Sequence, residues 1–198
     1  MAVYAFVFPG QGSQSVGMGQ DLAQAFSSAR SVFEEVDDAL GEKLSKIIFE
    51  GPADSLTSTE NAQPALMAVS MAVLRVLENE GGLDLPATAT LLAGHSLGEY
   101  AALAAARSLG IAQTAKLLRL RGQAMQKAVP AGEGGMAALI GATLEQAEEI
   151  CAQASKTALV EIANDNGGGQ IVLSGKMAGI DAAIALAKEM KIKRAVKL

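Results

Sequence analysis

The residues best suited to chemistry are those from Gly94 to Gly98, where a serine is flanked by a glycine two positions away on each side. This Gly-x-Ser-x-Gly pattern is typical of a nucleophile elbow, a sharp turn that exposes a serine hydroxyl between a strand and a helix. The glycines let neighbouring backbone pass without a Cβ clash. The helix that follows directs free N–H groups at the site, which favours a developing oxyanion. The pattern predicts a nucleophilic serine, Ser96.

The flanking sequence supports this interpretation. Residues 91–93 form a short apolar run typical of a strand, and residues 97–103 are good helix formers. A strand, a turn and a helix in that order are the context that a nucleophile elbow requires. A glycine-flanked serine at an ordinary strand-to-helix turn stays the alternative. Other parts of the chain are needed to decide between these two interpretations.

A second glycine-rich segment follows the first predicted strand. Residues 2–8 are continuously apolar and β-prone, so we expect a strand that is buried on both faces of a parallel sheet. The strand ends at Pro9, and a polar loop runs from Gly10 to Gln14. Proteins of the α/β class bind ligands at such a sheet edge. The glycine spacing and the absence of a following Gly-Lys-Ser/Thr exclude a nucleotide-binding loop.

Helical patterns account for most of the chain between this loop and residue 130. The predicted helices are 28–40, 44–49, 59–80 and 111–129, the last of which ends at Pro130. Arg121 differs from the other basic residues of the last helix, because it has apolar neighbours. These neighbours are Leu117, Leu118, Leu120, Met125 and Val129. A guanidinium in such surroundings either extends to solvent or meets an anion.

The pattern changes after Gly132. The predicted strands are 136–140, 158–163, 170–174 and 194–198, and the predicted helices are 144–154 and 180–190. The order strand–helix–strand–strand–helix–strand is the ferredoxin-like plan. We therefore expect an α/β fold with two domains. Residues 1–130 form a hydrolase-like domain with a parallel sheet, and residues 131–198 form a small ferredoxin-like domain.

The composition excludes several classes of function. The chain of 198 residues is 50% hydrophobic, which is enough for a substantial core. A net charge of −5 argues against a general nucleic-acid binder. The single cysteine, Cys151, excludes an internal disulfide and is typical of the reducing cytoplasm. The sequence has neither an apolar run long enough to span a membrane nor a signal-peptide pattern, so we expect a cytoplasmic protein.

Four motifs together resemble the malonyl-CoA:acyl carrier protein transacylase family. They are Phe8-Pro9-Gly10-Gln11-Gly12-Ser13-Gln14, Gln63-Pro64-Ala65, Gly94-His95-Ser96-Leu97-Gly98-Glu99-Tyr100, and Arg121-Gly122 with Met125. Their order and spacing match the family, and the resemblance covers essentially all 198 residues, the ferredoxin-like segment included. The start directly before the first strand resembles the free-standing bacterial enzyme rather than a domain of a synthase.

The resemblance implies an acyltransferase of fatty acid biosynthesis that moves malonyl from malonyl-CoA to the phosphopantetheine thiol of acyl carrier protein. Ser96 would carry malonyl as an ester, and the backbone N–H groups of Gln11 and Leu97 would form the oxyanion hole. Arg121 would bind the free malonyl carboxylate, because a guanidinium suits planar two-point contact. Three further positions match the pocket lining: Gln63, Met125 and Asn166. No metal or bound cofactor is implied, since the coenzyme A thioester is the substrate.

The resemblance also implies a catalytic histidine that this sequence lacks. In the family, the general base follows the ferredoxin-like segment, whereas this sequence ends at Leu198. His95 is the only histidine. It directly precedes Ser96 at a strand end, so its ring is expected to point away from the serine hydroxyl. We therefore expect these residues to be part of a longer polypeptide that supplies the histidine and further strands.

Two other functions stay open. A serine esterase or thioesterase would share the elbow but would have no use for a pocket arginine. An inactive carrier-protein-binding fragment would explain the missing base. A basic cluster near the end of the chain is either a solvated face or a surface that attracts an acidic carrier protein. Its members are Lys188, Lys191, Lys193, Arg194 and Lys197.

Overall fold

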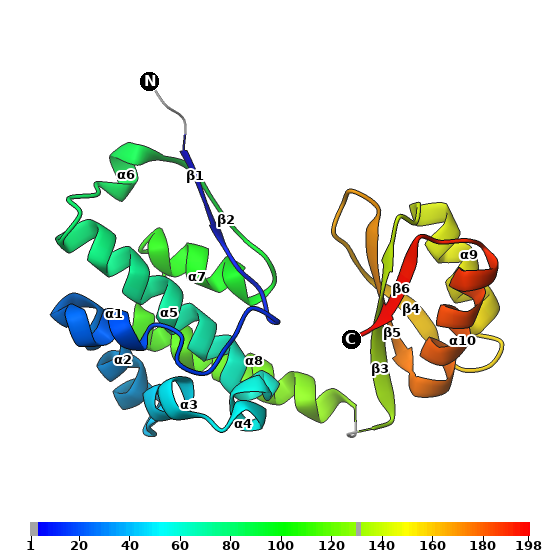
Figure 1. Ribbon diagram of the computed structural model, residues 1–198, viewed down its shortest axis with the longest axis horizontal. Helices are drawn as coiled ribbons and strands as arrows, with labels where there is room; N and C mark the ends of the chain where they lie inside the picture. The colour runs from blue at the N-terminus through cyan, green and yellow to red at the C-terminus, as the bar shows by residue number, and fades with distance from the viewer. Residues whose placement is uncertain (1–3, 130–131) are drawn as a thin grey trace. The chain divides into compact units, whose positions relative to one another are not determined.

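The computed structural model describes residues 4–129 and 132–198, which divide into two compact units (Figure 1). The first unit runs to Lys127, and the second runs from Ala128 to Leu198. The predicted domain boundary between residues 130 and 131 and the predicted helix stop at Pro130 lie outside the described residues, as do the first residues of the strand predicted at 2–8.

The first unit contains a two-stranded parallel sheet. Strand β1 (Tyr4–Phe8) pairs with β2 (Ala89–Gly94), and Phe8 lies opposite Gly94. In β1 only Phe8 is buried, and Val7 is 76% exposed. The expectation of a strand buried on both faces is therefore wrong for the described chain. Two strands with α7 packed against them leave much of the sheet surface uncovered.

Helices form the rest of the first unit (Figure 1). They are α1 (Gln20–Ala25), α2 (Ser27–Leu40), α3 (Leu44–Glu50), α4 (Ala53–Thr57), α5 (Thr59–Asn79), α6 (Leu85–Thr88), α7 (Leu97–Ala105) and α8 (Ile111–Ala128). The core is built around α5, which packs against α2 and α7. The four predicted helices are confirmed to within one residue at each end. Helices α1, α4 and α6 were not predicted, because they are too short to have a recognisable periodicity.

The second unit is an antiparallel sheet covered by two helices. Its strands are β3 (Gly134–Ile140), β4 (Val160–Asp165), β5 (Gln170–Lys176) and β6 (Arg194–Lys197), in the spatial order β4-β5-β3-β6. Helices α9 (Leu144–Ala154) and α10 (Met177–Glu189) lie on the same face of this sheet (Figure 1). The predicted order of strands and helices is confirmed.

The two units together give an α/β chain with one parallel and one antiparallel sheet. In the part of the chain that the structure describes, none of the helices is both long and apolar enough to cross a bilayer. The predicted strand–turn–helix element around Ser96 lies in the first unit, where β2 is followed directly by α7.

Candidate active site

Ser96 lies at the turn between β2 and α7, with a backbone conformation that non-glycine residues rarely adopt. Its φ is 56° and its ψ is −112°. Such a conformation persists only where the surrounding structure holds it in place. Here the N–H groups of Gly98 and Glu99 donate to the carbonyls of His95 and Ser96, at 2.9 and 3.1 Å. Because Ser96 is also exposed, the turn presents its hydroxyl to solvent, as a nucleophile elbow does.

The glycines of the elbow are required by close backbone contacts. A Cβ on Gly94 would overlap the backbone of Gly98, and a Cβ on Gly98 would overlap the carbonyl oxygen of Phe8. The loop after β1 also lies close to the elbow, since a Cβ on Gly10 would lie 2.5 Å from Nδ1 of His95. The ends of β1 and β2 and the start of α7 therefore meet where no side chain fits.

The two predicted oxyanion donors come from different elements. Leu97 is the first residue of α7, where a backbone N–H has no partner within the helix. Gln11 lies in the loop after β1, and its side-chain amide donates to Oγ1 of Thr59 at 3.3 Å. The loop is braced internally, because the Gly12 N–H donates to Oε1 of Gln14 at 2.8 Å. The loop after β1 lies close to the elbow, and the role of the two backbone N–H groups as oxyanion donors stays a prediction.

Arg121 of α8 makes a direct contact with Ser96. Its Nη2 donates to Oγ of Ser96 at 3.0 Å, and its Nη1 donates to Oε1 of Gln63 at 2.6 Å. The guanidinium carbon lies 5.9 Å from the centre of the Tyr100 ring, within the range of a cation–π contact. Nε2 of Gln63 lies 3.3 Å from Sδ of Met125. Four residues predicted for the site therefore belong to one connected network.

The partners of Arg121 are neutral groups. A hydroxyl, an amide and an aromatic ring surround its half-buried guanidinium. Within the described residues, no carboxylate forms an ion pair with it. Gln63 is fully buried, so it holds one edge of the guanidinium away from water. The positive charge is left uncompensated beside Ser96, where it favours an anionic ligand.

The close approach of α8 to α5 depends on Gly122. A Cβ at this position would lie 2.5 Å from Cα of Glu60 and 2.7 Å from the carbonyl oxygen of Thr59. The α8 backbone therefore packs directly on the first turn of α5. This packing brings Arg121 within reach of Gln63, although the two residues are far apart in the sequence.

Three predicted features lie away from this network or are not tested by it. Asn166 follows β4 in the second unit, so its place in the pocket stays a prediction. His95 is exposed beside Gly10, and the direction of its ring relative to the Ser96 hydroxyl also stays a prediction. Cys151 is buried on α9, and burial, together with the carboxylate of Glu161, raises the pKa of its thiol. A protonated thiol is a poor nucleophile.

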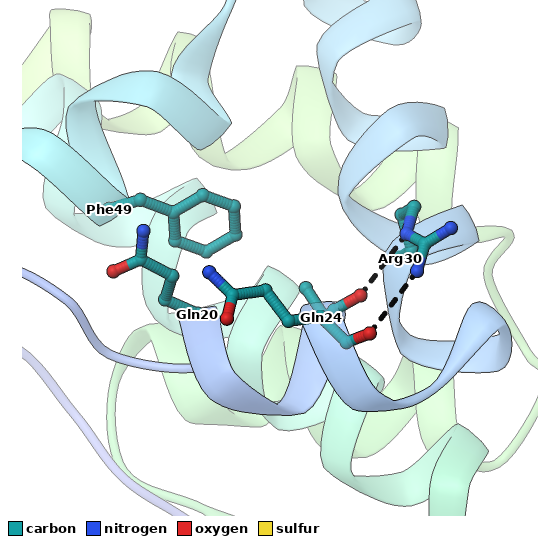
Figure 2. A pocket seen from close by; sticks show the side chains of 5 residues that line it. Gln20, Gln24, Arg30 and Phe49 are labelled. Carbon is teal, nitrogen blue, oxygen red and sulfur yellow. Dashed lines mark hydrogen bonds between the residues drawn. The ribbon is translucent and has the colours of Figure 1, made fainter.

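The first unit also contains a hollow built by other residues. This hollow of about 350 Å³ is lined by Gln20, Ala23, Gln24, Arg30 and Phe49. Figure 2 shows the side chains that line it. Here Arg30 donates to the carbonyls of Ala23 and Gln24, at 3.1 and 3.3 Å, so its guanidinium caps the end of α1. None of the predicted site residues lines this hollow. The described residues also contain no cluster of His, Cys, Asp or Glu able to hold a metal ion.

Two residues that contact predicted site residues had no predicted role. Tyr100 lies four positions after Ser96, so about one turn of helix brings it to the same side of α7. That spacing could have placed its ring near the serine. Thr59, which accepts from Gln11, carries no local signal for this contact, because the two residues come from separate elements.

Comparison with known proteins identifies the class of protein. The acyl transferase domain family matches residues 5–197, so the chain belongs to this family. Over its whole length it is 46% identical to the malonyl CoA-acyl carrier protein transacylase of Bacillus subtilis (strain 168), of which it covers 61%.

Solved structures of malonyltransferases are also similar to this chain. The acyl-carrier-protein-S-malonyltransferase from Bartonella henselae shares 59% identity with a TM-score of 0.94, and the match covers 100% of this chain and 62% of that one. PlMCAT in the PlMCAT:AntF complex, a malonyl-transacylase with its type II PKS acyl-carrier protein, shares 40% identity with a TM-score of 0.91. That match also covers 100% of this chain and 62% of the other. The chain thus spans about 62% of the length of these solved relatives.

Proposed function

We propose that the protein carrying this chain transfers a malonyl group from malonyl-CoA to the phosphopantetheine thiol of acyl carrier protein, in fatty acid biosynthesis. The observation that carries the proposal is the 3.0 Å contact between the Arg121 guanidinium and the Ser96 hydroxyl. A carboxylate-binding group beside a nucleophile suits an acyl group with a free carboxylate at its far end, as malonyl has. The malonyl-transferring relatives support the same substrate.

The reaction consists of two acyl transfers through Ser96. Its hydroxyl attacks the thioester carbonyl of malonyl-CoA, which forms a malonyl ester and releases coenzyme A. The carrier thiol then attacks this ester, which restores the hydroxyl. The backbone N–H groups of Gln11 and Leu97 stabilise the oxyanion in both steps. A general base takes the serine proton and returns it to the leaving group. We assign this base to a histidine outside these 198 residues, which contain only His95.

The side chains around Ser96 have separate roles in this proposal. Arg121 binds the malonyl carboxylate through two N–H groups, and the buried Gln63 holds the guanidinium in orientation. Met125 supplies an apolar wall next to Gln63. We propose Asn166 as a further pocket residue, on the strength of the family resemblance.

We also propose finer assignments for the two domains. Residues 1–130 form an α/β hydrolase-like acyltransferase domain, which the backbone conformation of Ser96 supports. Residues 131–198 form a ferredoxin-like domain, which is supported by the sheet order β4-β5-β3-β6 and by two helices on one face. We propose that the enzyme needs no resident cofactor and works in the cytoplasm, a compartment that suits its free thiol, Cys151.

The products formed from malonyl-CoA and holo-acyl carrier protein test this function. We expect the full-length protein to produce malonylated carrier protein, detected by intact mass, and the Ser96→Ala variant to produce none. Release of free malonate without a malonylated carrier would make the protein a thioesterase. Carrier binding with neither product would make it an inactive binding protein. Either of these two results overturns the proposal.

A further inference from the structure

Two arginines two positions apart on α8 bind two side-chain amides two positions apart on α5. Nη1 of Arg121 donates to Oε1 of Gln63, and Nη1 of Arg119 donates to Oδ1 of Asn61, both at 2.6 Å. Residues two apart on a helix project about 200° from one another around its axis. The two contacts therefore hold α8 against α5 from different sides.

Arg119 connects α8 to more than one element. Its side chain is only 15% exposed, and its Nη2 donates to Oε1 of Glu42, in the turn between α2 and α3. Its other partner, Asn61, is itself fixed, because Nδ2 of Asn61 donates to the carbonyl oxygen of Ser55 in α4 at 2.8 Å. A mostly buried guanidinium is stable only with such partners. Arg119 thus ties α8 to α5, α4 and the α2–α3 turn.

The backbone contact at Gly122 does not by itself determine how α8 lies against α5. At Gly122 the α8 backbone packs closely on Thr59 and Glu60, which sets the distance between the two helices. A glycine presents no side chain that could interlock with the facing helix, so this contact leaves the position of α8 along its own axis weakly determined. The directional hydrogen bonds of Arg119 restrict movement of α8 along this axis. Arg121, two positions further along α8, contacts Ser96.

We propose that Arg119 is a positioning residue, which aims the Arg121 guanidinium at the acyl group on Ser96 and thereby sets the preference for acyl groups with a free carboxylate. This inference rests on the proposed function. Two-point pairing between guanidinium and carboxylate tolerates little displacement. A small shift of α8 therefore weakens binding of a malonyl group and leaves an acetyl group, which has no carboxylate, almost unaffected.

The test compares malonyl-CoA with acetyl-CoA in the full-length protein. We expect Arg119→Met to lower the ratio of malonyl to acetyl kcat/KM by about 10-fold, with acetyl transfer within about two-fold of the wild type. Arg119→Lys keeps the charge and part of the donor geometry, so it should restore part of the ratio. If Arg119→Met does not fold, Arg119→Lys carries the test, and an unchanged ratio in that variant overturns the proposal.

Two further variants distinguish positioning from general stability. Lys116→Met removes an exposed charge from the same helix and should leave the ratio unchanged. In the Arg121→Ala background, Arg119→Met should cause no further change in the ratio, because its effect passes through Arg121. Equal losses with both substrates, or additive changes in the double variant, overturn the positioning role. If Arg121→Ala itself leaves the ratio unchanged, Arg121 does not select the acyl group and this inference fails, whereas the proposed function is tested separately by formation of malonylated carrier protein.

Discussion

The two units of the chain differ in how many polar side chains they bury. Among the residues that the structure describes, the buried polar or charged side chains are Asp37, Gln63 and Thr114, and all three lie in the first unit. The second unit has a core of aliphatic side chains, in which Leu139, Ile150 and Leu173 are fully buried. The half-buried Arg121 also lies in the first unit. Positive φ values at non-glycine residues occur in both units, at Ser96 and Arg107 in the first and at Lys191 in the second.

This difference agrees with the site proposed in the first unit. Buried polarity and unfavourable backbone conformations lower stability, so a fold retains them mainly where they serve a function. In the first unit, Gln63 and Ser96 meet at Arg121. The other two buried polar side chains lie elsewhere in this unit, where Asp37 accepts from Ser45 and Thr114 donates to the carbonyl of Gly110. The second unit has a four-stranded sheet with a regular aliphatic core. Substitutions should therefore separate activity from stability according to the unit in which they lie.

The largest effect is expected at Gly94. A methyl group there would overlap the backbone of Gly98, and backbone cannot move aside as a flexible side chain can. We expect Gly94→Ala to lower the free energy of unfolding by more than about 4 kcal/mol and to abolish acyl transfer. Gly110→Ala is the matched control, since a Cβ there meets nothing within 4 Å. Equal losses in denaturant titrations of the two variants would mean that the elbow is not tightly packed.

Arg121→Ala should change substrate preference more than stability. Loss of the guanidinium leaves the malonyl carboxylate without its partner, at a cost of roughly 2–5 kcal/mol in transition-state binding. Acetyl transfer does not need this contact and should be spared. Steady-state kinetics with malonyl-CoA and acetyl-CoA measure the change. If both substrates lose equally, Arg121 supports the fold rather than selecting the acyl group.

A core substitution in the second unit should change stability more than substrate preference. Leu173 is fully buried in β5, and Leu173→Ala leaves a cavity that we expect to lower the free energy of unfolding by about 2–5 kcal/mol. The ratio of malonyl to acetyl kcat/KM in the folded protein should stay at the wild-type value. A shift in this ratio would show that the contrast between the two units is not one of activity against stability.

The smallest effect concerns pH and the start of α9. Hydrogen bonds from its own backbone N–H and from the Thr143 hydroxyl lower the pKa of Glu145. A lowered folded-state pKa contributes stability above the ordinary glutamate pKa, and this contribution is lost as the pH falls through the lowered value. Glu145→Gln should therefore be slightly less stable than the wild type at about pH 7 and equally stable at about pH 3. A difference that persists at the lower pH would assign the effect to something other than this charge.

Local patterns in the sequence predicted most helices and the elbow. The helix at 144–154 was predicted with both ends correct. In the structure Thr143 forms a capping box with Gln146, so residues adjacent in the sequence determine where this helix begins. The burial of β1 was predicted wrongly. A continuous apolar run indicates a strand but does not tell which elements cover it, and Val7 is exposed.

The site was predicted by two different routes. Gly94 and Gly98 gave a local signal for the turn at Ser96, and the geometry of the turn agrees with it. The meeting of Arg121 with Gln63 joins positions 58 residues apart, and only the family resemblance suggested that both belong to one pocket. Neither route indicated the contact between Arg119 and Asn61, because pairing between two helix faces depends on their crossing geometry.

In the proposed function Ser96 carries the acyl group. The most direct test of this role is to incubate the full-length protein with malonyl-CoA alone and to locate any new ester by intact mass and peptide mapping. We expect one malonyl group, on the peptide that contains Ser96, and none on the Ser96→Ala variant. An ester on Ser13 or Ser108, or the same labelling in the Ser96→Ala variant, would contradict the account.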